Sequence, residues 1–199
     1  MLNTITIIQT LGLVGIFLII FTESGLFFGF FLPGDSLLFT AGIFAFKGFF
    51  SLSTLMIICA IAAILGDSVG YWTGKNMGRR LFERDAGFFF KKKRIYDAEH
   101  FYKKHGKYAI IIARFIPIIR TFAPIVAGLG RMDYKTFLSY NIIGGILWAV
   151  SILSLGYFLG QMIPNIDVYL LPIVILIIFI STVPVLVKLI RHRIVKSDE

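Results

Sequence analysis

Four stretches of this 199-residue chain are apolar for about as long as a helix needs to cross a lipid bilayer. Each crossing takes roughly 20 apolar residues to span about 30 Å of hydrocarbon. Hydrophobic residues make up 57% of the chain and charged residues only 16%, so the apolar side chains exceed what a soluble domain of this size buries. The sequence therefore predicts an all-α, multi-pass membrane protein whose transmembrane helices lie at about residues 5–22, 52–72, 137–160 and 168–190.

The basic residues gather in two places, which orients these helices. Eleven of the twenty Lys and Arg residues lie between Lys75 and Lys107, and four more (Lys188, Arg191, Arg193 and Lys196) lie at the C-terminus. Basic residues beside apolar segments face the cytoplasm, so we expect both termini and loop 75–107 on that side. The loop either lies on the leaflet as a basic amphipathic segment or is an ordinary cytoplasmic loop. This clustering, despite the net charge of +9, argues against a nucleic-acid partner.

Two further apolar stretches, residues 23–47 and 108–131, are interrupted near their middles. Pro33, Gly34 and Asp35 break the first, and Pro117 breaks the second. The limbs of the first would be about 13 and 16 Å long as helices, only half of a crossing. Irregular backbone at this depth is tolerated only inside protein or beside a water-filled cavity. We therefore predict two opposed re-entrant helical hairpins that meet near the midplane.

An internal repeat supports this arrangement. An offset of 86 residues superposes Ala41-Gly42 on Ala127-Gly128, and it superposes the Gly70–Gly74 segment on Gly156–Gly160. The offset pairs hairpin with hairpin and crossing with crossing, as a duplicated half of opposite topology would. The predicted domain is thus single: a first half at 1–74, the loop 75–107, a second half at 108–160 and a final helix at 168–190.

Ionisable residues inside apolar segments are costly to insert and are candidates for function. Five stand out here: Glu23, Asp35, Asp67, Arg114 and Arg120. The first hairpin carries two of the acids and the second carries both arginines. For each residue, a position near the interface or a structural ion pair is the competing interpretation.

Arg114 and Arg120 would point in different directions on an unbroken helix, but Pro117 lies between them and removes that constraint. Both guanidinium groups could then line one cavity and bind a phosphate or carboxylate. Glu23 and Asp35 cannot bind the same anion when ionised, so we interpret them as proton carriers. Asp35 could equally cap a half-helix that begins near Ser36. The hypothesis is that proton movement is coupled to anion movement.

No pattern in the chain indicates an enzyme, a cofactor or a metal site. The Gly70–Asn76 segment is one residue short of a phosphate-binding loop and lacks its final Ser or Thr. The three histidines lack metal-ligand spacing, and no Cys or Ser is placed with a His and an acid for covalent catalysis.

The charged residues and their surroundings resemble the DedA family of bacterial membrane proteins. The resemblance covers about residues 10–160 and is carried by these motifs: Glu23-Ser-Gly, Phe31-Leu-Pro-Gly-Asp35, Gly66-Asp67-x-x-Gly70-Tyr71, Lys104-His-Gly-Lys-Tyr108, Arg114-Phe-x-Pro117-x-x-Arg120 and Pro124-x-x-Ala-Gly128. It implies a location in the bacterial cytoplasmic membrane and a core shared with the VTT-domain lipid scramblases. It also implies that the acids and arginines at positions 23, 35, 114 and 120 are functionally important.

Members of the resembled family are implicated in returning undecaprenyl phosphate across the cytoplasmic membrane. We therefore expect a flippase for this anionic lipid carrier, with Arg114 and Arg120 on the phosphate and Glu23 or Asp35 exchanging a proton. Three alternatives stay open: a general phospholipid scramblase, a proton-coupled transporter of a small solute or ion, and a structural membrane protein with buried ion pairs. The expected partners are a membrane lipid and protons, and a homodimer is possible.

Overall fold

The computed structural model describes residues 4–26, 34–83 and 108–162. Six helices account for most of them, and no strand occurs among the described residues: α1 (Thr4–Gly25), α2 (Gly34–Phe46), α3 (Leu52–Glu83), α5 (Tyr108–Ala113), α6 (Pro117–Leu129) and α7 (Tyr134–Met162). The all-helical prediction is confirmed for this part of the chain. The expected crossing at 168–190, residue Pro33 and most of loop 75–107 lie outside the described residues.

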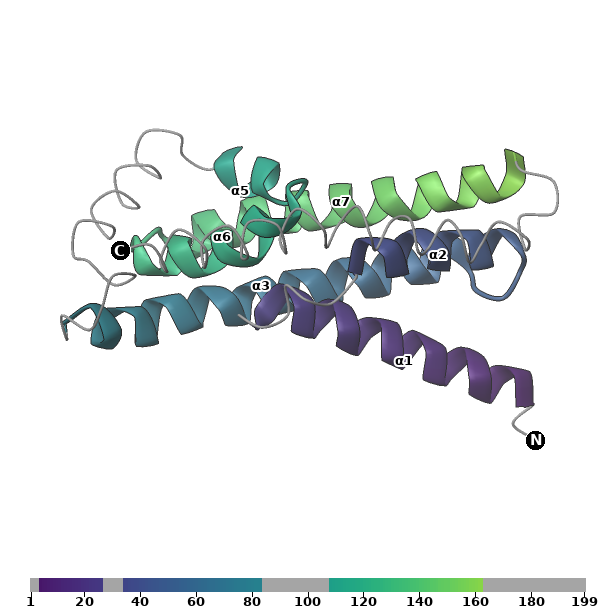
Figure 1. Cartoon of the computed structure of the whole chain (residues 1–199), viewed down its shortest axis with the longest axis horizontal. Coiled ribbons are helices and arrows are strands. Elements are labelled where there is room, and N and C mark those ends of the chain that lie inside the picture. The colour runs from purple at the N-terminus through teal and green to yellow at the C-terminus, as the bar shows by residue number, and fades with distance from the viewer. Residues whose placement is uncertain (1–3, 27–33, 84–107, 163–199) are drawn as a thin grey trace, which may run out of the picture.

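Helices α3 and α7 form the long axis of the molecule and run in opposite directions (Figure 1). Two segments, Leu52–Asn76 and Tyr134–Met162, are long and apolar enough to cross a membrane. Their outer faces carry exposed large side chains such as Ile57, Leu65 and Leu155, which suit contact with lipid. At one end Tyr71 stacks on Phe137, and its hydroxyl donates to the Met132 carbonyl oxygen at 2.5 Å.

Helix α1 packs against α3 and ends beyond the predicted boundary at residue 22. It includes Glu23 and continues to Gly25. Glu23 therefore belongs to the end of the first long helix rather than to a separate hairpin limb. The backbone N–H of Leu26 donates to the Thr22 carbonyl oxygen, so the helical hydrogen bonding of α1 continues past Glu23.

The two 13-residue helices, α2 and α6, are each too short to cross a membrane. They lie along opposite halves of the α3–α7 pair (Figure 1). Helix α2 packs chiefly against α7, and α6 chiefly against α3. Because α2 and α3 belong to the first predicted half and α6 and α7 to the second, each half packs its short helix on the long helix of the other.

Glycines allow these close crossings. A Cβ added at Gly42 would collide with the backbone of α7 at Leu153, and one added at Gly156 would collide with the carbonyl of Phe39 in α2. In the other half, a Cβ at Gly128 would collide with the Tyr71 carbonyl of α3. Gly42 and Gly128 correspond under the 86-residue offset, so the repeat seen in the sequence coincides with equivalent helix contacts.

The chain between α5 and α6 breaks where the proline predicts it. The backbone N–H groups of residues 114, 115 and 116 each donate to the carbonyl oxygen three residues earlier. These hydrogen bonds close three consecutive tight turns. Ile116 then adopts an extended conformation, with φ −115° and ψ 106°, because the residue before a proline is excluded from the helical region. Pro117 begins α6, where its missing N–H costs no hydrogen bond. This break positions Arg114.

Candidate functional site

Arg120 in α6 forms ion pairs with two carboxylates from different helices. Its Nη2 contacts Oε1 of Glu23 at the end of α1, and its Nη1 lies 2.7 Å from Oδ1 of Asp35 in the first turn of α2. Arg120 and Glu23 are buried, whereas the Asp35 side chain is 25% exposed. Asp35 is therefore the most exposed member of this Arg120 cluster (Glu23, Asp35, Arg120).

Trp148 completes the Arg120 cluster from the α7 side. Its indole Nε1 donates a hydrogen bond to Oδ1 of Asp35 at 3.0 Å, and its ring lies 4.6 Å from the Arg120 guanidinium carbon. The side chain is 1% exposed. Trp148 thus fixes the rotamer of Asp35 by a hydrogen bond and holds the Arg120 cation against its π face.

Gly34 is required where α2 begins. A Cβ added there would overlap the carboxylate of Glu23, so only glycine lets the first turn of α2 approach the end of α1 this closely. Helix α2 starts at Gly34, not near Ser36, which places Asp35 inside the first turn. Its carboxylate reaches Arg120 and Trp148. The Pro33-Gly34-Asp35 sequence predicts a glycine-containing break here, but not the contact with Glu23 that requires the glycine.

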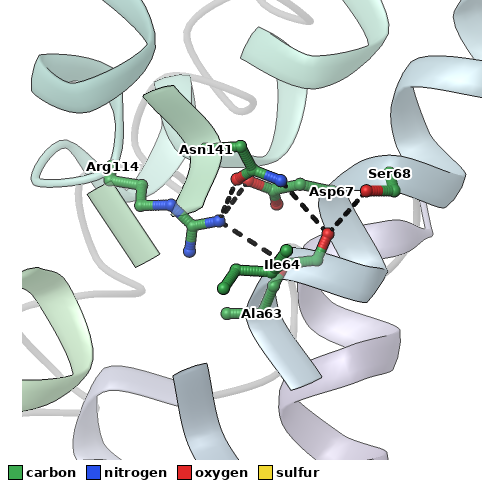
Figure 2. A network of polar contacts seen from close by, with 6 residues as sticks. All are labelled: Ala63, Ile64, Asp67, Ser68, Arg114 and Asn141. Carbon is green, nitrogen blue, oxygen red and sulfur yellow. Dashed lines mark hydrogen bonds and ion pairs between the residues drawn. The ribbon is translucent and has the colours of Figure 1, made fainter. Parts of the chain in front are cut away.

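Arg114 belongs to a second polar cluster, shown in Figure 2. Its Nη2 donates to Oδ2 of Asp67 in α3 and to Oδ1 of Asn141 in α7, both at 2.5 Å. A longer contact of 3.4 Å reaches the Ala63 carbonyl. Asn141 in turn donates from Nδ2 to the Ile64 carbonyl at 3.1 Å, which ties α7 to α3 at this level. All three side chains of this Arg114 cluster (Asp67, Arg114, Asn141) are buried.

Two adjacent glycines on α7 make room for Arg114. A Cβ at Gly144 would lie 3.3 Å from Cδ of Arg114, and a Cβ at Gly145 would lie 3.5 Å from its Cζ. The guanidinium group therefore lies against bare backbone on one side and against Asp67 and Asn141 on the other. This explains how a long cationic side chain fits between α3, α5 and α7.

The structure divides the four principal charged residues into two groups. We expected Glu23, Asp35, Arg114 and Arg120 to share one chamber. Three of them do meet, around Arg120, but Arg114 pairs with Asp67, the fifth ionisable residue of the apolar segments. The break at Pro117 does free the two arginines from a single helix, but it sends them to different partners.

Sequence reasoning missed Asn141 and Trp148. Both residues carried a usable signal, because an amide inside a long apolar helix usually bonds across to another helix. A tryptophan in a membrane helix normally lies near an end, at the headgroup level, but Trp148 is the middle residue of α7. The indole N–H of a tryptophan in the middle of a long apolar helix needs a hydrogen-bond acceptor, which here is Asp35.

The two clusters together hold three carboxylates and two guanidinium groups. Arg120 faces two acids and Arg114 faces one, so the described buried site has an excess of one negative charge if every group is ionised. Burying an uncompensated charge is expensive, and a bound proton removes it. The arrangement can therefore take up protons, and protonation of an acid would leave Arg120 with a free donor for an anion.

Comparison with known proteins shows where the chain belongs. The VTT domain family model matches residues 32–158. Protein DedA of Escherichia coli is 43% identical over 180 residues, which cover 89% of this chain and 82% of that protein. An uncharacterized membrane protein of Mycobacterium leprae is 43% identical over 169 residues, covering 85% of this chain and 75% of the relative.

A third relative, the inner membrane protein YqjA of Escherichia coli, is 35% identical over 146 residues, covering 73% of this chain and 66% of the relative. No solved structure matches the chain significantly. The motifs around the Arg120 and Arg114 clusters fall largely within the matched domain. The resemblance seen in the sequence is thus confirmed, and the chain belongs to the DedA family of VTT-domain membrane proteins.

Proposed function

We propose that this protein translocates an anionic lipid, a polyprenyl phosphate such as undecaprenyl phosphate, across the cytoplasmic membrane in exchange for protons. The observation that carries the proposal is the pairing of Arg120 with both Glu23 and Asp35. An arginine held by two acids can release its donors to a phosphate only when one acid is protonated or moves away. Proton binding and phosphate binding are then two states of one site.

Depth within the membrane supports this proposal. Trp148 lies at the midpoint of the 29-residue α7, about 21 Å from either end at 1.5 Å per residue. The Arg120 cluster contacts Trp148 and would then lie near the centre of the bilayer. A binding site at the midplane, formed at helix breaks, is the usual arrangement in transporters built from inverted repeats.

The topology belongs to the same proposal. Helices α1, α3 and α7, with a fourth at 168–190, would cross the membrane, and both termini would face the cytoplasm. Helices α2 and α6 would be limbs of two opposed re-entrant hairpins. The partial exposure of Asp35 gives the Arg120 cluster a route to solvent or to a lipid headgroup. We assign the phosphate to Arg120 before Arg114 because the partner of Arg114, Asp67, is almost fully enclosed.

The experiment is a flipping assay in liposomes with fluorescently labelled polyprenyl phosphate. Glu23→Gln and Asp35→Asn should weaken the dependence of flipping on a proton gradient, and Arg120→Lys should lose flipping at every pH. Unchanged flipping by Arg120→Lys would overturn the role of Arg120. A parallel assay with labelled phosphatidylglycerol distinguishes a polyprenyl phosphate flippase from a general scramblase, which would move both lipids.

A further inference from the structure

The Arg114 cluster has polar atoms that its protein partners leave unsatisfied. Nη2 of Arg114 makes all of the hydrogen bonds of that guanidinium among the described residues. Its Nε and Nη1 are buried and have no hydrogen-bond partner in the described part of the chain, and neither has Oδ1 of Asp67. Buried polar atoms in native proteins almost always have a partner, and when protein supplies none, an ordered water usually does.

The chemistry of these open atoms selects the occupant. Arg114 offers donors and Asp67 offers an acceptor within one cluster (Figure 2). An anion would satisfy the donors but be repelled by Asp67, and a cation would be repelled by Arg114. Water both donates and accepts hydrogen bonds, so of these three occupants it is the one that satisfies the Arg114 donors and the Asp67 acceptor together.

The position of the Arg114 cluster suggests what the water does. Asn141 lies about 10 Å along α7 from its Tyr134 end, and Trp148 lies about 10 Å further along. Asp67 interacts electrostatically with both Arg114 and Arg120. Asp67 and Asn141 share Nη2 of Arg114, so Asp67 lies at the level of Asn141, between the Arg120 cluster and the end of the bundle that carries Asn76 and Tyr134.

We propose that the Arg114 cluster is a hydrated proton-binding site through which protons pass between the Arg120 cluster and this end of the bundle. This inference rests on the proton coupling of the proposed function. A hydronium ion gives its proton to the Asp67 carboxylate, leaving water and a neutral carboxyl, and the proton leaves again to a water on the side of Glu23. Arg114 stays charged throughout, held by Asn141 and the Ala63 carbonyl.

The surroundings of Asp67 set how readily its carboxylate takes up and gives back a proton. Three buried charged side chains surround α3: Glu23 from α1, Arg114 from the α5–α6 turn and Arg120 from α6. Asp35 of α2 is partly exposed. Helix α7 contributes the neutral Asn141. A proton on Asp67 is thus moved within a field of two fixed cations and two further acids.

The direct test is modification of carboxyls by dicyclohexylcarbodiimide, which reacts with protonated carboxyls in apolar surroundings. The full-length protein in phosphatidylethanolamine and phosphatidylglycerol vesicles is treated across a range of pH and digested for mass spectrometry. We expect an adduct on Asp67 that declines as the pH rises, both in the unmodified protein and in the control Thr73→Ala on the same helix. Absence of an Asp67 adduct at every pH, with adducts on Glu23 or Asp35, would overturn the inference.

A charge-neutral variant separates proton transfer from structural pairing. Asp67→Asn with Arg114→Gln removes both charges and leaves amides that can bond to each other and to Asn141. The inference predicts a protein as stable as the original whose proton-driven flipping is about a hundredfold slower, the low end of what a positioned proton-transfer group contributes. Full flipping with an unchanged pH profile would show a structural ion pair instead.

The two proposals can fail separately. If the unmodified protein flips no labelled polyprenyl phosphate yet Asp67 is labelled in a pH-dependent way, the hydrated site stands and the substrate assignment falls. If flipping occurs and requires Arg120 while Asp67 remains unlabelled, the substrate assignment stands and the hydrated site falls.

Discussion

Nε1 of Trp148 donates a hydrogen bond to Oδ1 of Asp35 across 3.0 Å, joining the midpoint of α7 to the first turn of α2. The same oxygen accepts a hydrogen bond from Nη1 of Arg120. One carboxylate oxygen therefore links the two predicted halves of the chain. A motion that separates α2 from α7 must break the hydrogen bond between Trp148 and Asp35.

Trp148→Phe should destabilise the protein by about 1.5–3 kcal/mol, because it removes a hydrogen bond to a charged acceptor and keeps an aromatic ring for Arg120. An unfolding titration in mixed detergent micelles measures the change. Trp72→Phe is the control, since Trp72 is 43% exposed and its ring makes a cation–π contact with the Lys75 ammonium group. Equal effects of the two substitutions would contradict a special role for the buried indole.

Arg120→Lys should abolish most lipid flipping while keeping the positive charge. A lysine offers a single ammonium group and cannot bridge Glu23 and Asp35 as the planar guanidinium does. The loss of one charge-assisted hydrogen bond alone corresponds to about a tenfold effect or more. The initial rate of flipping in liposomes is the measurement, and Lys135→Arg, on the exposed start of α7, is the matched control that should flip normally.

Gly34→Ala should destabilise the protein by about 1–3 kcal/mol, because the added methyl group meets the Glu23 carboxylate, which cannot turn away without breaking its ion pair with Arg120. The cost reflects overpacking at the junction of α1 and α2. The control is Gly15→Ala in α1, where nothing lies within 4 Å of the added Cβ. Thermal unfolding in detergent compares the two variants. A Gly34→Ala protein as stable as the control would mean that α2 begins elsewhere.

Gly156→Ala and Gly160→Ala test the crossing of α2 and α7 as a matched pair. The methyl group at position 156 would collide with the backbone of Phe39, whereas at position 160 it meets the side chain of Phe46 at 3.2 Å. A side chain can turn away and a backbone cannot, so only Gly156→Ala should lower stability by about 1–3 kcal/mol. If Gly160→Ala proves the more damaging, α7 packs against α2 in a different register.

Asp133 precedes α7, and its Oδ2 accepts hydrogen bonds from the backbone N–H and hydroxyl of Thr136. These bonds lower the pKa of Asp133 from its ordinary value of 3.8. The carboxylate therefore contributes stability that is complete above pH 3.8 and is lost as the pH falls through the lower folded value.

Asp133→Ala should consequently be less stable than the original protein at neutral pH, and the difference should vanish in acid below the folded pKa. Unfolding temperatures measured from neutral to acid pH provide the comparison. Asp133→Asn, which retains a capping oxygen without the titration, should show no such convergence. A difference between Asp133→Ala and the original that persists in strong acid would exclude the carboxylate as its source.

Much of the architecture follows from the order of apolar and breaking residues. The long apolar runs predicted α1, α3 and α7, and Pro117 predicted the break that separates α5 from α6. The end of α1 was placed too early because Glu23 looks like a boundary in a one-dimensional hydropathy pattern. Its charge is satisfied by Arg120, which is 97 residues away in the chain, and no local signal reports that partner.

The candidate site was predictable as a list of residues but not as a set of pairs. Charge in an apolar segment identified the three acids and both arginines. Which acid meets which arginine depends on how the helices are rotated, and that is decided by glycine contacts such as Gly144 against Arg114. Asp67 stands apart from both hairpins in α3, so its position in the sequence did not predict that it is the carboxylate that pairs with Arg114.

The exchanged packing of the short helices has a consequence for how the protein is made. Helix α2 rests on α7, which begins at Tyr134, 100 residues after Gly34, and is complete only at Met162. Until the second half has been synthesised, α2 lacks its main packing partner, α7, and Asp35 lacks Arg120 and Trp148. A chain that ended before α7 would leave the α7-facing side of α2 uncovered by protein.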